Sequence, residues 1–120
     1  MNGITNVTMT SEQRHDQLLD VLERCMTACE KGAMTGLGTA GNSNGASQLT
    51  RLALDCAEIC ATTARFVARG SAYMNELLVL CSQICKACEI ACRKEENCFQ
   101  ECADTCHECH LTCALVAQPS

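Results

Sequence analysis

Aromatic residues and proline are almost absent from this chain of 120 residues. It has no Trp, one Tyr and two Phe, and its single proline is Pro119. Sandwiches and barrels depend on β-branched and aromatic residues and on frequent turns, so an all-β fold is all but excluded. Hydrophobic residues make up 48% of the chain and charged residues 19%, which excludes a chain that is disordered throughout.

Clusters of basic residues and long apolar runs are missing as well. The net charge is −5 and the 9 basic residues form no block, so no nucleic-acid partner is expected. No apolar run approaches the roughly 20 residues of a membrane span, so no membrane partner is expected either. Residues 1–7 lack the charged and apolar regions of a signal peptide, which predicts a cytoplasmic protein unless a leader peptide was removed.

Cysteine, by contrast, is abundant, with 13 residues. In a short secreted protein this density indicates a disulfide framework. The odd number, the missing export signal and a helical spacing speak against that interpretation. Cysteine also serves as a small buried hydrophobic residue, but this role accounts for about two or three of the cysteines and not for thirteen aligned ones.

The hydrophobic pattern predicts four helices. The first covers about 11–31, with Thr10 and Gln13 as its capping box and Gly32 as its end. The second runs over about 47–69. The third runs from Ser71, which can cap it, to about 93 or 95, and the fourth covers about 98–117.

The segments between these helices complete the predicted architecture. Gly and small polar residues over about 32–46 predict a long connection, and residues 1–10 and 118–120 are expected to be tails. Predicted helices of similar length, joined by two short connections, favour an antiparallel four-helix bundle over residues 11–117. The fold class is therefore all-α, with one domain.

The cysteines form one stripe on each predicted helix, because nearly all steps between them are three or four residues. Each stripe continues into aliphatic residues, so the cysteines are expected to line the bundle core. The end with the Gly-rich connection should hold thiols, and the opposite end should be closed by Leu18, Val67, Met74 and Leu115 or Val116. The candidate metal ligands are Cys25, Cys29, Cys56, Cys60, Cys81, Cys85, Cys88, Cys92, Cys98, Cys102, Cys106, Cys109 and Cys113.

The spacing favours metal binding over disulfides. Cysteines at i and i+4 on a helix have Cβ atoms about 5–6 Å apart, whereas a disulfide needs about 3.5–4.5 Å. A metal held linearly between two sulfurs would separate them by about 4.5 Å, which the helix accommodates. Zinc tetrathiolate sites carry net negative charge that is costly in a narrow core, whereas Cu(I) bridged by thiolates can reach about one ion per cysteine and stay neutral.

Other functions remain as alternatives to Cu(I) binding. An iron–sulfur electron carrier would place its cysteines in loops with Cys-x-x-Cys spacing. Two further alternatives are a zinc or general thiol-metal buffer and a disulfide-bonded structural bundle. No catalytic arrangement of Ser, His and Asp or of Cys and His is recognisable, so no enzyme activity is expected.

Methionines and histidines near the cysteines are weaker candidates. Met26 flanks Cys25, and Met34 lies at the start of the Gly-rich segment, so both are possible accessory ligands where Cu(I) is taken up, although packing or loop roles are more common. His107 is expected to point away from the cysteine stripe and His110 to lie on its flank, as surface or intersubunit residues.

The repeated Cys-x-x-x-Cys pattern, as in residues 56–60, 88–92 and 109–113, resembles that of the bacterial copper storage proteins. The resemblance covers about residues 11–117. It implies a Cys-lined four-helix bundle that binds many Cu(I) ions and assembles as a homotetramer. It further implies that all thirteen cysteines bind metal. The function that it implies is copper storage in the cytosol, rather than copper delivery or detoxification.

Overall fold

The computed structural model describes residues 9–39, 44–95 and 100–117. It contains four helices and, over this part of the chain, no strand: α1 (Ser11–Thr39), α2 (Asn44–Ala68), α3 (Met74–Lys94) and α4 (Gln100–Val116). The predicted all-α fold is confirmed. None of these helices is both long enough and apolar enough to span a bilayer.

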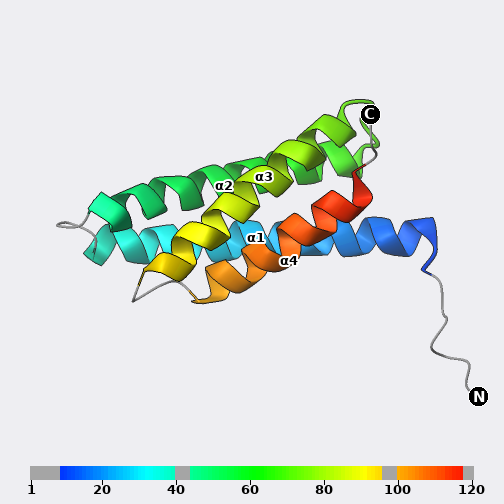
Figure 1. The fold of residues 1–120 in the computed structure, drawn as a ribbon. Coiled ribbons are helices and arrows are strands. Elements are labelled where there is room, and N and C mark those ends of the chain that lie inside the picture. The colour runs from blue at the N-terminus through cyan, green and yellow to red at the C-terminus, as the bar shows by residue number, and fades with distance from the viewer. Residues whose placement is uncertain (1–8, 40–43, 96–99, 118–120) are drawn as a thin grey trace, which may run out of the picture.

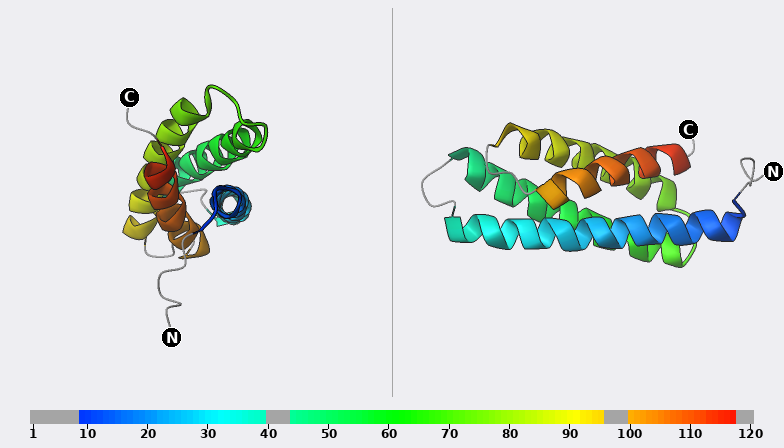
Figure 2. Two further views of the ribbon diagram at one scale, coloured as in Figure 1. Left: turned by 90° about the vertical axis from the view of Figure 1, so that its right-hand side faces the viewer. Right: turned by 90° about the horizontal axis from the view of Figure 1, so that it is seen from below.

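The helices form an antiparallel bundle in which each helix packs against two neighbours (Figures 1 and 2). α1 contacts α2 and α4, and α3 contacts the same two helices. The end of α1, the start of α2, the end of α3 and the start of α4 lie at one end of the bundle, here called the α1–α2 end. The passage from α2 to α3 lies at the other, the α2–α3 end, together with the start of α1 and the end of α4.

Local signals at the helix ends are largely where the sequence predicts them. The backbone N–H of Thr10 donates to Gln13 Oε1 at 2.8 Å, and the N–H of Gln13 donates to Thr10 Oγ1 at 3.0 Å, so the capping box is confirmed. α2 is followed by Gly70 at φ 63, a left-handed conformation suited to glycine. Ser71 lies before α3, where its Oγ accepts from the N–H of Tyr73 at 3.0 Å, and α3 begins only at Met74.

The predicted Gly-rich connection over 32–46 is wrong for most of its length. α1 continues through Gly32 to Thr39, and α2 already begins at Asn44, so the four helices have unequal lengths of 29, 25, 21 and 17 residues. Glycine costs a helix about 1 kcal/mol per residue, which packing can offset. Gly32 and Ala33 are both buried, so this stretch of α1 is held by its neighbours.

The core consists of thiols along most of the bundle, with Leu49 buried near the α1–α2 end and further aliphatic side chains at the α2–α3 end. Leu18 and Val67 are buried there, and Met74 and Val116 pack against them. Leu115 is 85% exposed and takes no part in this closure. The predicted aliphatic plug is therefore confirmed with Val116, rather than Leu115, as its member from α4.

Candidate metal centre

Twelve cysteines from all four helices meet in the bundle core. Each is fully buried, with 0% of its surface exposed, and each is a free thiol. Cys98, the thirteenth predicted ligand, lies outside the described residues. The inward stripe predicted from the three- and four-residue spacing is confirmed for these residues: Cys25, Cys29, Cys56, Cys60, Cys81, Cys85, Cys88, Cys92, Cys102, Cys106, Cys109 and Cys113.

The thiols form a continuous chain of contacts along the bundle axis. The shortest sulfur–sulfur distances join different helices: 3.3 Å between Cys29 and Cys102, and 3.4 Å between Cys56 and Cys85. Successive contacts of 3.3–4.0 Å connect one end of the thiol core to the other. The path runs through Cys88, Cys102, Cys29, Cys106, Cys56, Cys85, Cys60, Cys109 and Cys113.

Thiols four residues apart also lie within reach of one another. Their sulfurs are 3.9 Å apart in Cys25 and Cys29, and 3.8 Å apart in Cys81 and Cys85. A disulfide bond is about 2.05 Å long, so these are contacts between separate thiols. The separation is also shorter than the roughly 4.5 Å that a linear metal bridge requires, so an inserted ion must push the sulfurs apart by about half an ångström.

The contacts create four overlapping groups of four thiols whose sulfurs all lie within 4.8 Å of one another. Cys25, Cys29, Cys56 and Cys106 form one such group near the middle of the core. The other three are Cys25, Cys56, Cys60 and Cys85; Cys29, Cys88, Cys102 and Cys106; and Cys60, Cys81, Cys85 and Cys109. Because the groups share members, one thiol can serve two neighbouring ions.

Proton affinity in this core is set by thiol–thiol contacts and by burial. Hydrogen bonding from Cys106 and Cys29 lowers the pKa of Cys102 to about 5. The contact with Cys102 in turn raises the pKa values of Cys29, Cys92 and Cys106, and burial raises them further. Contacts with Cys102 and Cys106 also lower the pKa of Cys88, so the thiol–thiol contacts distribute the protons of the core unevenly.

A surface depression of about 190 Å³ between α1 and α4 has Cys102 among its lining residues. It is lined by Ala28, Lys31, Gly32, Thr35, Glu101 and Cys102. A larger depression of about 570 Å³ lies at the α2–α3 end, but Leu18, Val67 and Met74 line it and no thiol does. Of these two depressions, only the one between α1 and α4 has a cysteine in its lining.

The two predicted accessory methionines differ in burial. Met26 is partly buried and packs against the core. Met34 lies on α1 rather than in a loop, and its side chain is 57% exposed. The structure thus places Met34 on the surface of α1.

The histidines of α4 occupy the outer side of the bundle, as predicted. His107 Nδ1 lies 3.0 Å from Glu89 Oε2, and His110 Nε2 lies 3.0 Å from Glu89 Oε1. Sequence analysis did not single out Glu89, because the convergence of α3 and α4 on it is a tertiary feature. His15, on the first helix, contacts the backbone oxygen of Val67 at 3.0 Å.

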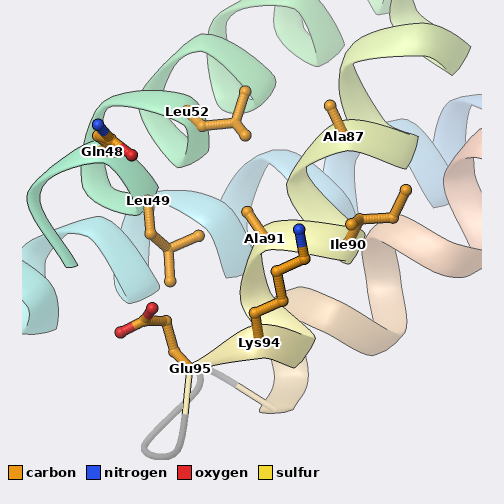
Figure 3. Close-up of a pocket in the computed structure, with 8 residues that line it drawn as sticks. All are labelled: Gln48, Leu49, Leu52, Ala87, Ile90, Ala91, Lys94 and Glu95. Carbon is orange, nitrogen blue, oxygen red and sulfur yellow. The ribbon is translucent and has the colours of Figure 1, made fainter. Parts of the chain in front are cut away.

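A shallow groove between α2 and α3 is the other notable surface feature (Figure 3). It is lined by Gln48, Leu49, Leu52, Ala87, Ile90, Ala91, Lys94 and Glu95, and no thiol lines it. Its apolar residues and its single lysine and glutamate offer no set of metal ligands. This groove therefore adds no candidate ligands to the thiols of the core.

Comparison with known proteins agrees with this geometry. Residues 11–118 match the family model described as copper storage protein. An uncharacterized cysteine-rich protein of Bacillus subtilis, YhjQ, is 32% identical over 107 residues, which span 88% of this chain and 98% of the relative.

Solved structures with a similar fold include copper storage proteins. A Cu(I)-bound copper storage protein, BsCsp3, superimposes with a TM-score of 0.81 at 30% identity, covering 88% of this chain and 100% of that one. The apo form of copper storage protein 3 from Bacillus subtilis has a TM-score of 0.76 at 30% identity, covering 86% and 98%. A protein from Nitrosospira multiformis has a TM-score of 0.79 at 29% identity, covering 89% and 97%.

Proposed function

We propose that this chain, which belongs to the copper storage protein family, stores Cu(I) on the thiols of its core. The observation that carries the proposal is the continuous chain of buried thiols from Cys88 to Cys113, with sulfur–sulfur contacts of 3.3–4.0 Å. Soft thiolates suit Cu(I), and a core of shared thiols can hold many ions at once. The Cu(I)-bound relative of similar fold supports this choice of metal.

All thirteen cysteines are the proposed ligands, including Cys98. We expect each ion to be held by two thiolates and each thiolate to bridge two ions, so loading approaches about one Cu(I) per cysteine. Each bound Cu(I) replaces one thiol proton, so the charge of the core does not change as it fills. Zinc held by four thiolates would instead accumulate negative charge in a core whose described thiols are completely buried.

Copper uptake is proposed to begin at Cys102. Cys102 is one of the residues that line the depression between α1 and α4, and contacts with Cys106 and Cys29 lower its pKa to about 5, which favours its thiolate form. A first ion bound there lies next to Cys29, only 3.3 Å from the Cys102 sulfur. Further ions can then move inward from thiol to thiol without crossing an apolar region.

Cytoplasmic storage and self-association complete the proposal. Large apolar side chains are exposed on the outer faces of α3 and α4, among them Leu80 (45%), Ile90 (48%) and Leu111 (46%). Burying such residues between copies stabilises an oligomer. This exposure supports the homotetramer that the family resemblance implies, and light scattering of the purified protein measures the number of copies. We expect no catalytic activity.

An anaerobic titration with Cu(I) against a competing chelator tests the function. We expect saturation near thirteen ions per chain, with the release of about one proton for each thiol that is protonated in the metal-free core, because Cu(I) replaces the thiol proton. Elemental analysis of protein isolated from copper-fed cells measures the metal that the protein holds in vivo.

Saturation at three or four ions with tetrahedral thiolate spectra would instead support a zinc buffer and contradict copper storage. A brown protein containing iron and sulfide would support an electron carrier. Thiol labelling followed by intact-mass measurement distinguishes both from a disulfide-bonded bundle.

A further inference from the structure

We propose that Glu89, His107 and His110 form a second metal site, outside the thiol core, that takes a divalent ion of the Zn²⁺ class. The three residues contribute one carboxylate and two imidazoles, and their ligand atoms all lie within 4.8 Å of one another. Two histidines and one glutamate are a ligand set that zinc uses when its fourth position is left to water. This inference goes beyond copper storage and uses none of the core cysteines.

The geometry arises from the packing of α3 against α4. His107 and His110 are three residues apart on α4, so both side chains project on the same side of that helix. Glu89 approaches them from α3, with its carboxylate oxygens 3.0 Å from His107 Nδ1 and 3.0 Å from His110 Nε2. Ser82 Oγ donates to the backbone oxygen of His110 at 2.9 Å, which ties the two helices together beside the site.

These distances are close to those of an occupied site. Zinc bonds to nitrogen and oxygen are about 2.0–2.2 Å long, which places tetrahedral ligand atoms about 3.3 Å apart. The two imidazole–carboxylate distances of 3.0 Å are therefore already close to ligand spacing, and all the ligand atoms lie within 4.8 Å of one another. The imidazole rings lie 5.5 Å apart at their centres and are perpendicular, so neither ring blocks the other.

The surroundings of Glu89 hold its carboxylate ionised and in place. Arg93 Nε donates to Glu89 Oε2 at 2.8 Å, and Arg93 also contacts Asp104 Oδ1 at 3.4 Å. Desolvation alone would raise the pKa of Glu89, but the hydrogen bonds from Arg93, His107 and His110 outweigh it and lower that pKa. Asp104 offsets the charge of Arg93, so the site keeps the negative charge that a cation requires.

Accessibility separates this site from the core. Glu89 and His110 are each 13% exposed, whereas His107 is 53% exposed, so water can reach the open position of a bound ion. Imidazole and carboxylate suit Zn²⁺ and similar divalent ions, whereas Cu(I) prefers the thiolates of the core. The same chain would thus hold two different metals in two separate places.

Zinc titration observed through the histidine side chains by NMR tests this proposal. The chain has 3 histidines, and His15, which lies on α1 and contacts the backbone of Val67, is the internal control. On addition of ZnCl₂ we expect the imidazole signals of His107 and His110 to shift to a saturating end point at one ion per chain, beyond any zinc taken by thiols. The His15 signals should not move.

Substitution of the proposed ligands tests how much each contributes to the zinc affinity of the site. Replacing His107→Ala or Glu89→Gln should weaken zinc binding at the histidines by about tenfold or more, while His15→Ala should leave it unchanged. Unshifted signals of His107 and His110 at millimolar zinc would overturn the proposal and leave the triad as an ion-pair cluster. Equal shifts of all three histidines would overturn it as well, because they indicate non-specific binding.

Two preparations keep this test independent of copper storage. Both the reduced metal-free protein and the Cu(I)-loaded protein are titrated with ZnCl₂, and the histidine shifts should be the same in both. A failure of copper storage would appear as a low Cu(I) count, with the histidine response of the metal-free protein unaffected.

Discussion

At the scale of single residues, each core thiol has several thiol neighbours rather than one partner. The sulfur of Cys106 lies 3.5 Å from Cys29, 3.7 Å from Cys56 and 3.8 Å from Cys25. Pairs four residues apart are therefore one kind of contact among several, and contacts between helices are as close or closer. A metal ion can be shared across helices wherever such contacts exist.

Removing one pair of thiols should lower the copper capacity by a defined amount. In the double variant Cys81→Ser and Cys85→Ser we expect about two fewer Cu(I) ions per chain, because capacity follows the number of thiolates. Competitive Cu(I) titration measures this change. The control is Gln83→Ser on the exposed side of the same helix, which should keep the full capacity. A loss of half the ions or more from the double variant would indicate one cooperative cluster instead.

One buried hydroxyl should be dispensable for stability. Thr50 is 4% exposed, and its Oγ1 has no hydrogen-bond partner among the described residues. Burying an unsatisfied polar group costs about 1–3 kcal/mol, so Thr50→Val should raise the free energy of unfolding by about 1 kcal/mol. Urea denaturation of the reduced protein measures it. In the control Thr63→Val, a hydroxyl that donates to the Leu77 oxygen at 3.5 Å is lost, so the gain should be smaller or absent.

At the scale of helices, α1 is the element that sequence patterns describe least well. Its second half contains Gly32, Gly36 and Gly38, yet the helix continues to Thr39. Gly32 is buried and, together with Cys102 of α4, lines the depression between these two helices. A residue without a side chain at this position leaves the depression unfilled beside Cys102, where copper uptake is proposed to begin.

Filling this depression should slow copper uptake without changing the amount bound. We expect Gly32→Leu to lower the rate of Cu(I) loading several-fold, because the new side chain stands between solvent and Cys102. Stopped-flow absorbance of the Cu(I)-thiolate bands measures the rate. Thr35→Leu, at the exposed rim of the same depression, serves as a second variant in case leucine is too large at position 32.

The matched control is Gln17→Leu in the larger depression at the α2–α3 end. Its loading rate should equal that of the unaltered protein, since aliphatic side chains separate this end from the thiols. Slower loading in Gln17→Leu together with normal loading in Gly32→Leu and Thr35→Leu would contradict this prediction, because it would indicate that copper enters at the α2–α3 end.

At the scale of the whole molecule, the metal-free bundle should be folded at neutral pH and lose stability in alkali. Contacts with Cys109 and Cys81, together with burial, raise the pKa of Cys113, and neighbouring thiols raise those of Cys60 and Cys85. Above pH about 8.5 the thiols of the unfolded chain ionise while these stay protonated. The folded state then binds more protons, so its stability falls as pH rises, by about 1.4 kcal/mol per pH unit for each such thiol.

Urea denaturation of the reduced apo protein at pH 7 and pH 9.5 measures this effect. The Cu(I)-loaded protein should show little change, because copper has already replaced the thiol protons. Thiols whose pKa values are lowered by their neighbours contribute nothing to the alkaline loss; they are Cys25, Cys56, Cys81, Cys88 and Cys102. A far-ultraviolet spectrum dominated by coil at pH 7, or equal alkaline losses in the two forms, would contradict the prediction.

The amino-acid sequence alone determined the class of fold, the cysteine stripes and the kind of metal. Cysteines at steps of three and four on a helix must share a face, and two local signals, the Thr10–Gln13 capping box and the left-handed Gly70, lie near helix ends. The family resemblance rests on the same repeated spacing. These features are local, because they depend only on residues within a few turns of one another.

Only the tertiary structure decided which thiols meet, how far α1 extends and where the core approaches solvent. The contact between Cys29 and Cys102 and the convergence of His107 and His110 on Glu89 join residues from different helices. Their existence depends on the rotation and axial position of one helix against another, which spacing within a helix does not fix. Likewise, glycines that favour a loop in isolation stay helical in α1 because the packing of the bundle outweighs their small individual cost.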